Sequence, residues 1–137
     1  MTDELGWSRV VTLHGRVEQE LAKALQRQHG LGLSEYRALA QLAATECGEL
    51  RIQELADAIG LNQSSVSRLV ARLEEAGLTR RDLCADDRRG VYSVITDAGR
   101  KRLATAAPVY TEVLTQALDR AAADAELGGA VRAVRAL

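Results

Sequence analysis

The segment QELADAIGLNQSSVSRLVARLEEAGL, residues 53–78, decides the fold. Apolar residues recur at helical spacing on both sides of a short break at 60–62, which predicts two helices joined by a tight turn. Asn62 is a favourable N-cap for the second helix, and Gly77 is a favourable residue just beyond its end. We therefore predict a helix-turn-helix whose second helix covers residues 63–76.

The second helix carries two different faces. Its apolar stripe predicts a buried side formed by Val66, Leu69, Val70 and Leu73. The opposite face is small, hydrogen-bonding and basic, and acids enter only in the last turn. Solvated helices usually carry Glu and Lys, so this face favours insertion into the major groove of DNA, where such side chains bond phosphates and base edges. We expect DNA contacts from Gln63, Ser64, Ser65, Ser67, Arg68 and Arg72.

Two short extended runs follow at 79–83 and 91–95, on either side of the charged stretch CADDRRG. They predict a β-hairpin, and a helix-turn-helix followed directly by a hairpin is a winged helix. A narrow minor groove favours an inserted arginine. We expect Arg88 and Arg89 to contact DNA from the wing, with Asp87 bracing Arg89. The alternative is a flexible loop whose charges only keep it soluble.

Helical patterns flank this segment on both sides. Residues 5–29 place one stripe on a first helix, made of Trp7, Val10, Val11, His14, Val17, Leu21, Ala24 and Leu25. A second helix is expected from the N-cap Ser34 to Gly48, followed by a very short strand. Thr96 is the expected cap of a long later helix, and a weak helix is expected after Asp124.

Composition describes a globular chain. Its 137 residues are 47% hydrophobic and 27% charged, and no apolar run reaches the roughly 18 residues of a membrane span. The first residues lack the apolar run of a signal peptide, so a cytoplasmic protein is expected. The net charge is −1, but residues 63–102 hold nine Lys and Arg against six Asp and Glu, a local charge of +3.

The two cysteines, Cys47 and Cys84, form no CxxC motif and no metal-ligand set with the histidines. No paired-carboxylate, nucleophile or phosphate-loop motif is present, so we expect no enzyme, no metal and no cofactor. Two alternatives to a ligand-controlled DNA binder stay open. Cys84, at the base of the wing, is a candidate redox sensor, and a winged helix can also serve only for protein contacts.

The stretches at 54–81 and 85–100 resemble the MarR (multiple antibiotic resistance regulator) family of bacterial winged-helix transcription regulators. The family has a D-x-R wing followed by Leu-Thr and a glycine, which correspond here to Asp87-x-Arg89, Ile95-Thr96 and Gly99. The resemblance implies one mainly α domain with a small β-hairpin wing. The winged-helix lobe would cover about 33–103, and dimerisation helices would cover about 5–29 and 104–137.

The resemblance also implies a homodimer that binds a pseudo-palindromic site in double-stranded DNA, usually as a repressor. The apolar stripe near Trp7 and Val11 agrees, because nothing obvious within one subunit would cover it. Members of the family commonly bind small anionic or phenolic effectors between the dimer helices and the DNA-binding lobe. The residues implied for such a site are His14, Tyr36, Arg37 and Tyr110.

Overall fold

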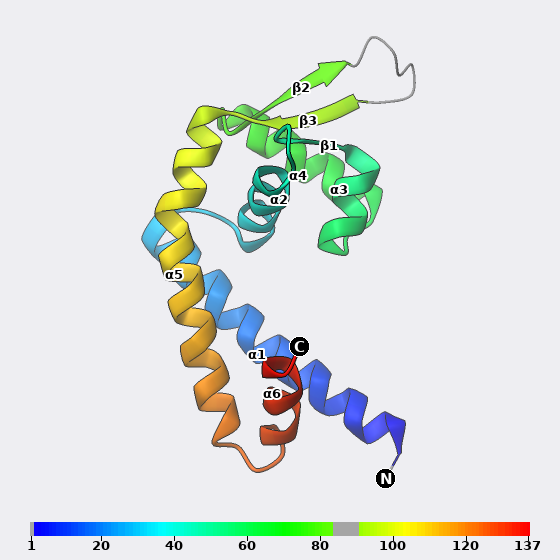
Figure 1. Cartoon of the computed structure of the whole chain (residues 1–137), viewed down its shortest axis with the longest axis vertical. Coiled ribbons are helices and arrows are strands. Elements are labelled where there is room, and N and C mark those ends of the chain that lie inside the picture. Colours follow the sequence, from blue (N-terminus) through cyan, green and yellow to red (C-terminus); the bar gives the residue numbers. More distant parts are fainter. Residues whose placement is uncertain (1, 84–90) are drawn as a thin grey trace. The chain divides into compact units, whose positions relative to one another are not determined.

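The computed structural model describes residues 2–83 and 91–137 (Figure 1). The chain divides into two compact units, one formed by Leu31–Ala106 and the other by Met1–Gly30 together with Ala107–Leu137. The elements in chain order are α1 (Asp3–His29), α2 (Leu33–Ala44), β1 (Glu49–Arg51), α3 (Ile52–Ile59), α4 (Gln63–Glu75), β2 (Thr79–Leu83), β3 (Val91–Ile95), α5 (Asp97–Ala122) and α6 (Gly128–Arg135). The expected mainly helical fold with a small β wing is confirmed.

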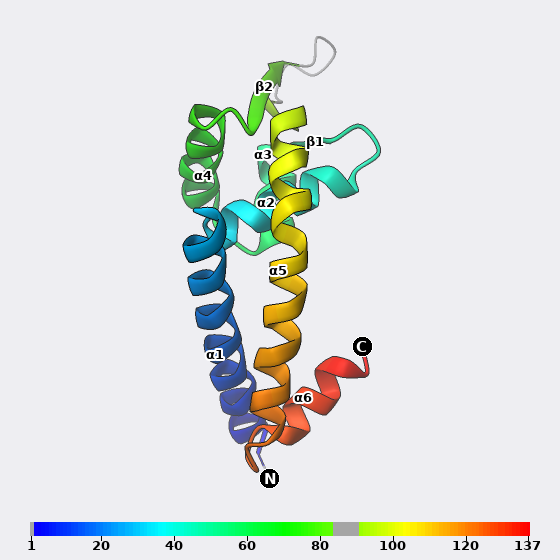
Figure 2. The same cartoon turned by 90° about the vertical axis from the view of Figure 1, so that its left-hand side faces the viewer.

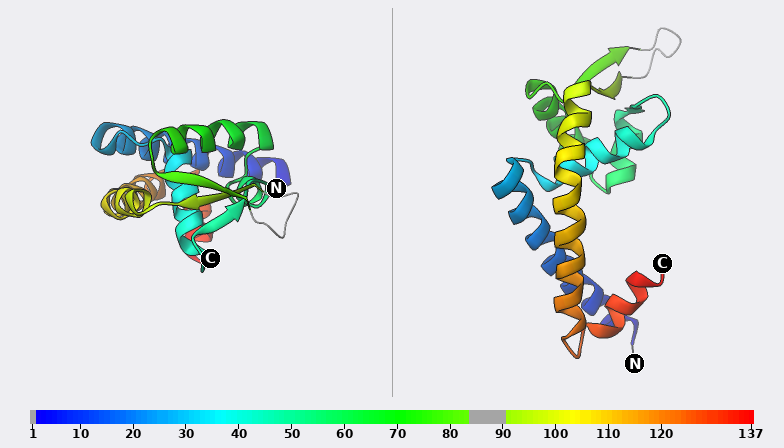
Figure 3. Two further views of the ribbon diagram at one scale, coloured as in Figure 1. Left: turned by 90° about the horizontal axis from the view of Figure 1, so that it is seen from above. Right: turned by 60° about the vertical axis from the view of Figure 1, so that its left-hand side comes forward.

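The unit Leu31–Ala106 contains a three-stranded antiparallel sheet. Its order is β1-β3-β2, so the predicted hairpin of β2 and β3 gains β1 as a third strand on the far side of β3. The register sets Arg51 opposite Tyr92 on one side and Arg81 opposite Ser93 on the other. Figure 3 shows α4 running alongside the hairpin strands when this unit is seen from above. The sheet therefore lies directly beside the second helix of the helix-turn-helix.

The core of this unit is aliphatic. The four residues predicted to form the buried stripe of α4 are each at most 1% exposed. Leu39 and Leu42 of α2 and Leu55 of α3 are also buried and belong to the same core. Fully burying such a side chain contributes roughly 1.5–3 kcal/mol relative to leaving it in water. This stripe fixes which face of α4 turns outward.

The second helix differs from its predicted bounds at both ends. It starts at Leu33 rather than after Ser34, because Glu35 reaches back and accepts a hydrogen bond from the backbone N–H of Gly32 at 3.1 Å. It ends at Ala44, where the Thr45 hydroxyl donates to the Leu42 carbonyl oxygen at 2.7 Å. Gly48, the expected end, instead precedes β1 with a positive φ of 70°.

The start of α5 is locked onto the turn that follows α4. The Thr96 hydroxyl accepts from the backbone N–H of Gly99 at 3.0 Å, which confirms the predicted cap, and donates to the Gly77 carbonyl at 2.8 Å. A Cβ on Gly99 would collide with the Leu78 carbonyl oxygen. The Ile-Thr-x-x-Gly pattern thus has a physical reason, since only glycine allows this approach.

In the other unit, α1 packs on α6 and lies beside the later turns of α5 (Figure 2). Its buried residues include Leu21 and Leu25 of α1 and Val131 of α6. Exposed ion pairs link the helices: Arg16 with Asp124 at 3.2 Å, Arg120 with Glu20, and Arg135 with Asp119 at 2.7 Å. Each pair of this kind is worth about 1 kcal/mol at most.

Asp124 lies in the turn between α5 and α6. Its Oδ1 accepts the backbone N–H of Glu126 at 2.9 Å, and its Oδ2 accepts a hydrogen bond from Arg16 at 3.2 Å. These contacts, the backbone bond foremost, lower the pKa of the Asp124 carboxyl below its ordinary value of 3.8. The ionised carboxylate is therefore the form that this turn stabilises.

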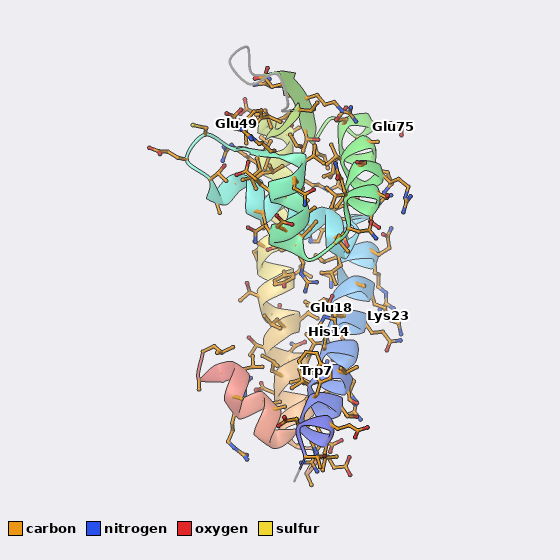
Figure 4. All side chains as sticks on the ribbon, turned by 90° about the vertical axis from the view of Figure 1, so that its right-hand side faces the viewer. Trp7, His14, Glu18, Lys23, Glu49 and Glu75 are labelled. Atoms are coloured by element: carbon orange, nitrogen blue, oxygen red, sulfur yellow. The ribbon has the colours of Figure 1, made fainter. Side chains whose placement is uncertain are left out.

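The predicted stripe on α1 is only half covered within the chain. Val17, Leu21 and Leu25 are buried, whereas Trp7 is 68% exposed and Val11 is 52% exposed. Figure 4 labels Trp7 on this helix. The other large exposed apolar side chains of the described residues belong to the same unit: Leu5, Val10, Val134 and Leu137. No helix in the described part of the chain is both long and apolar enough to cross a membrane.

Candidate nucleic-acid interface

The turn between α3 and α4 sets the direction of α4. Gly60 takes the left-handed conformation with φ 73°, and the N–H of Leu61 donates to the Ala56 carbonyl at 3.1 Å. The Asn62 side chain then accepts the backbone N–H of Ser65 at 2.8 Å, so the predicted N-cap is confirmed. No acid lies in the first turn of α4, which leaves the partial positive charge of its N-terminus uncompensated by a side chain.

The outward face of α4 carries the residues that the sequence predicted as DNA contacts. Ser65 is half-buried, and the remaining five are exposed: Gln63, Ser64, Ser67, Arg68 and Arg72. Glu74, the first acid on the helix, comes in its last turn and is engaged by Arg81. The face therefore offers an amide, hydroxyl groups and two guanidinium groups without a free carboxylate among them, a chemistry that suits phosphates and base edges.

The wing strands are present at the predicted residues, β2 at Thr79–Leu83 and β3 at Val91–Ile95. The predicted wing contacts Arg88 and Arg89, the predicted brace Asp87 and the candidate sensor Cys84 lie outside the described residues. On β2 itself, Arg81 Nε donates to Glu74 Oε1 at 2.6 Å, and Arg80 lies 3.7 Å from Asp82.

A groove of about 350 Å³ opens along one edge of the outward face of α4. We call it the α4 groove. It is lined by Arg51, Ile52, Gln53, Gln63, Ser67, Val70, Arg81 and Val91. Gln63 and Ser67 belong to the predicted contact set, and Val70 comes from the same helix. The other lining residues come from β1, α3 and the wing strands.

Sequence reasoning missed Arg51 and Arg81 in this groove. Arg51 is placed by the pairing of β1 with β3, where its Nε donates to the Tyr92 hydroxyl at 3.1 Å and its guanidinium carbon lies 5.6 Å from the centre of that ring. A three-residue strand has too short a pattern to reveal this pairing. The one available signal was the pair Arg80-Arg81 directly after the helix-turn-helix.

The residues implied for an effector site fall into both units. His14 is exposed on α1, 3.7 Å from Glu18, and Tyr110 is half-buried on α5. Tyr36 is buried and Arg37 is half-buried, both on α2. A second groove, of about 310 Å³, contains none of these residues and is lined by Arg16, Gln19, Glu20, Ala117, Arg120 and Ala121. Their grouping into one site thus stays a prediction.

Among residues 2–83 and 91–137, no group of three or more His, Cys, Asp or Glu side chains is arranged to hold a metal ion. Cys47 is a free, exposed thiol in the segment between α2 and β1. No acid, base or nucleophile cluster within the described residues accompanies the α4 groove, whose lining is basic, amide, hydroxyl and aliphatic. This chemistry is suited to binding an anionic surface.

Known proteins share both the sequence pattern and the architecture. The model of the MarR family matches residues 29–90, which cover the helix-turn-helix and the first wing strand. Sco3205, a MarR family transcriptional regulator from Streptomyces coelicolor solved in complex with DNA, is 34% identical, with a TM-score of 0.79 over 98% of this chain and 91% of that one. The chain belongs to the MarR family.

Other MarR family structures agree over almost the whole length. AbsC, a MarR family transcriptional regulator from Streptomyces coelicolor, is 28% identical, with a TM-score of 0.80 over 98% of this chain and 91% of that chain. A MarR family transcriptional regulator from Silicibacter pomeroyi is also 28% identical, with a TM-score of 0.72 over 99% and 96%. The flanking helices are therefore part of the MarR architecture as much as the winged helix is.

Proposed function

We propose that this MarR family protein is a homodimeric transcriptional repressor that binds a pseudo-palindromic operator in double-stranded DNA. The α4 helix enters the major groove and reads bases through Arg68 and its neighbours, while Arg88 and Arg89 reach the minor groove from the wing. The observation that carries this proposal is the outward face of α4, which is exposed, hydrogen-bonding and basic and has no carboxylate before the last turn of the helix. The MarR relative solved with DNA supports it. In this reading the protein is not an enzyme.

The homodimer is supported by the uncovered apolar surface of the unit that contains α1. Trp7 and Val11 on α1, together with Val134 on α6, are large apolar side chains that face solvent in a single chain. Several large exposed apolar side chains within one compact unit are a feature of interaction surfaces. Two copies joined there would present two α4 helices, and an inverted repeat in the operator would match their two-fold symmetry.

A small anionic or phenolic effector is proposed to control the affinity of the protein for DNA. Such a ligand releases DNA only if it binds the DNA-incompetent arrangement of the dimer more tightly than the competent one. The proposed lining residues are His14, Tyr36, Arg37 and Tyr110. Of these, Arg37 offers the charge for an anion, and Tyr36 and Tyr110 offer aromatic surface for a phenolic ring.

The deciding experiment is selection of duplexes from a random DNA pool by the purified protein, followed by sequencing. We expect an inverted repeat with half-sites about one helical turn apart. Sedimentation of the protein alone and with the selected duplex measures whether two chains bind each site. Retention of DNA without any enriched sequence would remove the operator from the proposal, and no retention even at low salt would favour a module for protein contacts.

A further inference from the structure

The α4 groove is adjacent to the face of α4 proposed to read DNA, and the two surfaces share residues. Gln63 and Ser67, one helical turn apart on that face, form one wall of the groove. Arg51 and Gln53 come from the junction of β1 and α3, and Arg81 comes from β2. A duplex that contacts the α4 face therefore lies next to side chains from three further elements, β1, α3 and β2.

The charge of the groove is positive. Arg51 and Arg81 line it, Arg81 with its Nε bonded to Glu74, and none of the described lining residues is an acid. The two carboxylates nearest in sequence to Arg51 on α3 are already engaged, since Glu54 accepts the backbone N–H of Arg51 at 3.0 Å and Asp57 accepts from the Gln53 amide at 3.0 Å. Among residues 2–83 and 91–137, the groups that an anion in the groove would meet are therefore guanidinium and amide groups.

Arg51 is held in place before any partner arrives. Its Nε donates to the Tyr92 hydroxyl, and its guanidinium lies over the Tyr92 ring. The strand register puts the two residues directly opposite each other on β1 and β3. An arginine held in this way loses less side-chain freedom on binding.

We propose that the α4 groove takes a phosphate of the DNA backbone, with Arg51 as its principal contact and Tyr92 as the residue that positions Arg51. The proposal rests on the proposed DNA binding and extends the interface from α4 and the wing to the β1–α3 junction. Arg51 supplies affinity without sequence preference, because a phosphate is the same at every step of the duplex.

The test is the DNA affinity of the full-length protein, measured by fluorescence anisotropy on the selected operator and on a random duplex across a salt series. Arg51→Gln should weaken both complexes about tenfold at about 0.1 M salt and reduce the salt slope by roughly 0.9 for each bound subunit. Arg51→Lys should restore the slope, since the charge returns, but not the whole affinity. Lys23→Gln, the matched loss of one exposed charge on α1, should change the slope by much less.

Tyr92→Phe separates positioning from charge. It removes the hydroxyl that holds Arg51 but keeps the ring and the net charge. We expect a two- to threefold loss of affinity, on the order of half a kcal/mol, with an unchanged salt slope. A Tyr92→Phe slope that falls as far as that of Arg51→Gln would show that Tyr92 acts by holding the fold rather than by aiming Arg51.

Two results overturn the proposal while leaving operator binding intact. One is wild-type affinity and slope in folded Arg51→Gln. The other combines two observations: inorganic phosphate stabilises the wild type more than chloride does at equal ionic strength, and Arg51→Gln binds DNA as tightly as the wild type. That result would make the groove a site for free anions. Failure of the wild type to bind any duplex would instead overturn the proposed function itself.

Discussion

Arg81 on β2 and Glu74 in the last turn of α4 are joined by a hydrogen bond of 2.6 Å between Nε and Oε1. The pair links the first wing strand to the helix proposed to read DNA. It also shows an acid orienting an arginine within this lobe, which is the role that the sequence predicted for Asp87 toward Arg89. Those two residues lie outside the described part of the chain, so that prediction remains to be tested.

Glu74→Gln should lower the free energy of unfolding by less than about 1 kcal/mol, because both side chains are partly exposed and water screens the pair. The loss should shrink in high salt. Urea unfolding at low and high ionic strength measures both effects. Glu75→Gln is the matched control, since Glu75 is exposed in the same turn and forms no ion pair with any described residue. Equal losses in the two variants would remove the ion pair as the cause.

Arg68→Ala should weaken operator binding by about 1–3 kcal/mol and random-duplex binding by much less, because Arg68 is proposed to contact a base edge. Titration of both duplexes under one salt condition measures the difference. Losses of equal size on the two duplexes would assign Arg68 to the phosphate backbone and leave base reading to the remaining residues of the α4 face.

Gly99→Ala should destabilise the winged-helix lobe by about 2 kcal/mol or more, because the new methyl group collides with the Leu78 carbonyl oxygen and crowds Ile95 Cγ1. Thermal unfolding measures it. Gly15→Ala is the control: it makes the same change within α1, where nothing lies within 4 Å, and should raise stability by about 0.5–1 kcal/mol. A stable Gly99→Ala protein would contradict the close contact at the start of α5.

Thr79→Val should raise the free energy of unfolding by about 1 kcal/mol. The Thr79 side chain is 3% exposed, and its hydroxyl has no hydrogen-bond partner among the described residues, so valine keeps the shape and removes a buried polar group. Thr105→Val, which replaces an exposed hydroxyl bonded to the Lys101 carbonyl, should change stability little. Loss of stability in Thr79→Val would mean that the hydroxyl has a partner in solution.

The Asp124 carboxyl should make stability depend on pH in the acid range. Its pKa is lower in the folded chain than the ordinary 3.8, so its contribution is complete above that value and is lost as the pH falls through the folded pKa. Asp124→Asn should therefore have a lower free energy of unfolding than the wild type at neutral pH. This difference in the free energy of unfolding should become smaller below about pH 4. Urea unfolding at several pH values measures it, and a gap that stays constant into acid would contradict the prediction.

Local signals predicted the parts of the fold that local chemistry decides. Asn62 and Thr96 cap helices because their side chains reach an N–H three residues ahead, and the spacing alone reveals this. The bounds of β2 and β3 matched because a glycine and a charged run separate two alternating segments. The outward face of α4 could be predicted because the apolar stripe of that helix identifies the opposite, buried face.

The pairing of β1 with β3 could not be predicted from the sequence. The three residues of β1 are too few to set a register by pattern, so the meeting of Arg51 with Tyr92, 41 positions apart, needed the structure. The start of α2 was misplaced for a smaller reason: Ser34 is a good cap, but the Glu35 side chain favours Gly32 in that position. The stripe on α1 was predicted as a whole, yet periodicity cannot tell which part of a stripe the same chain covers.

The order β1-β3-β2 leaves two strands with one unpaired side each. Such edges are templates on which sheets of separate molecules join into aggregates. Here one edge strand has only three residues, and the other carries Arg80, Arg81 and Asp82 in succession. Both features discourage strand addition, so the open edges of the sheet are poor templates for joining separate molecules.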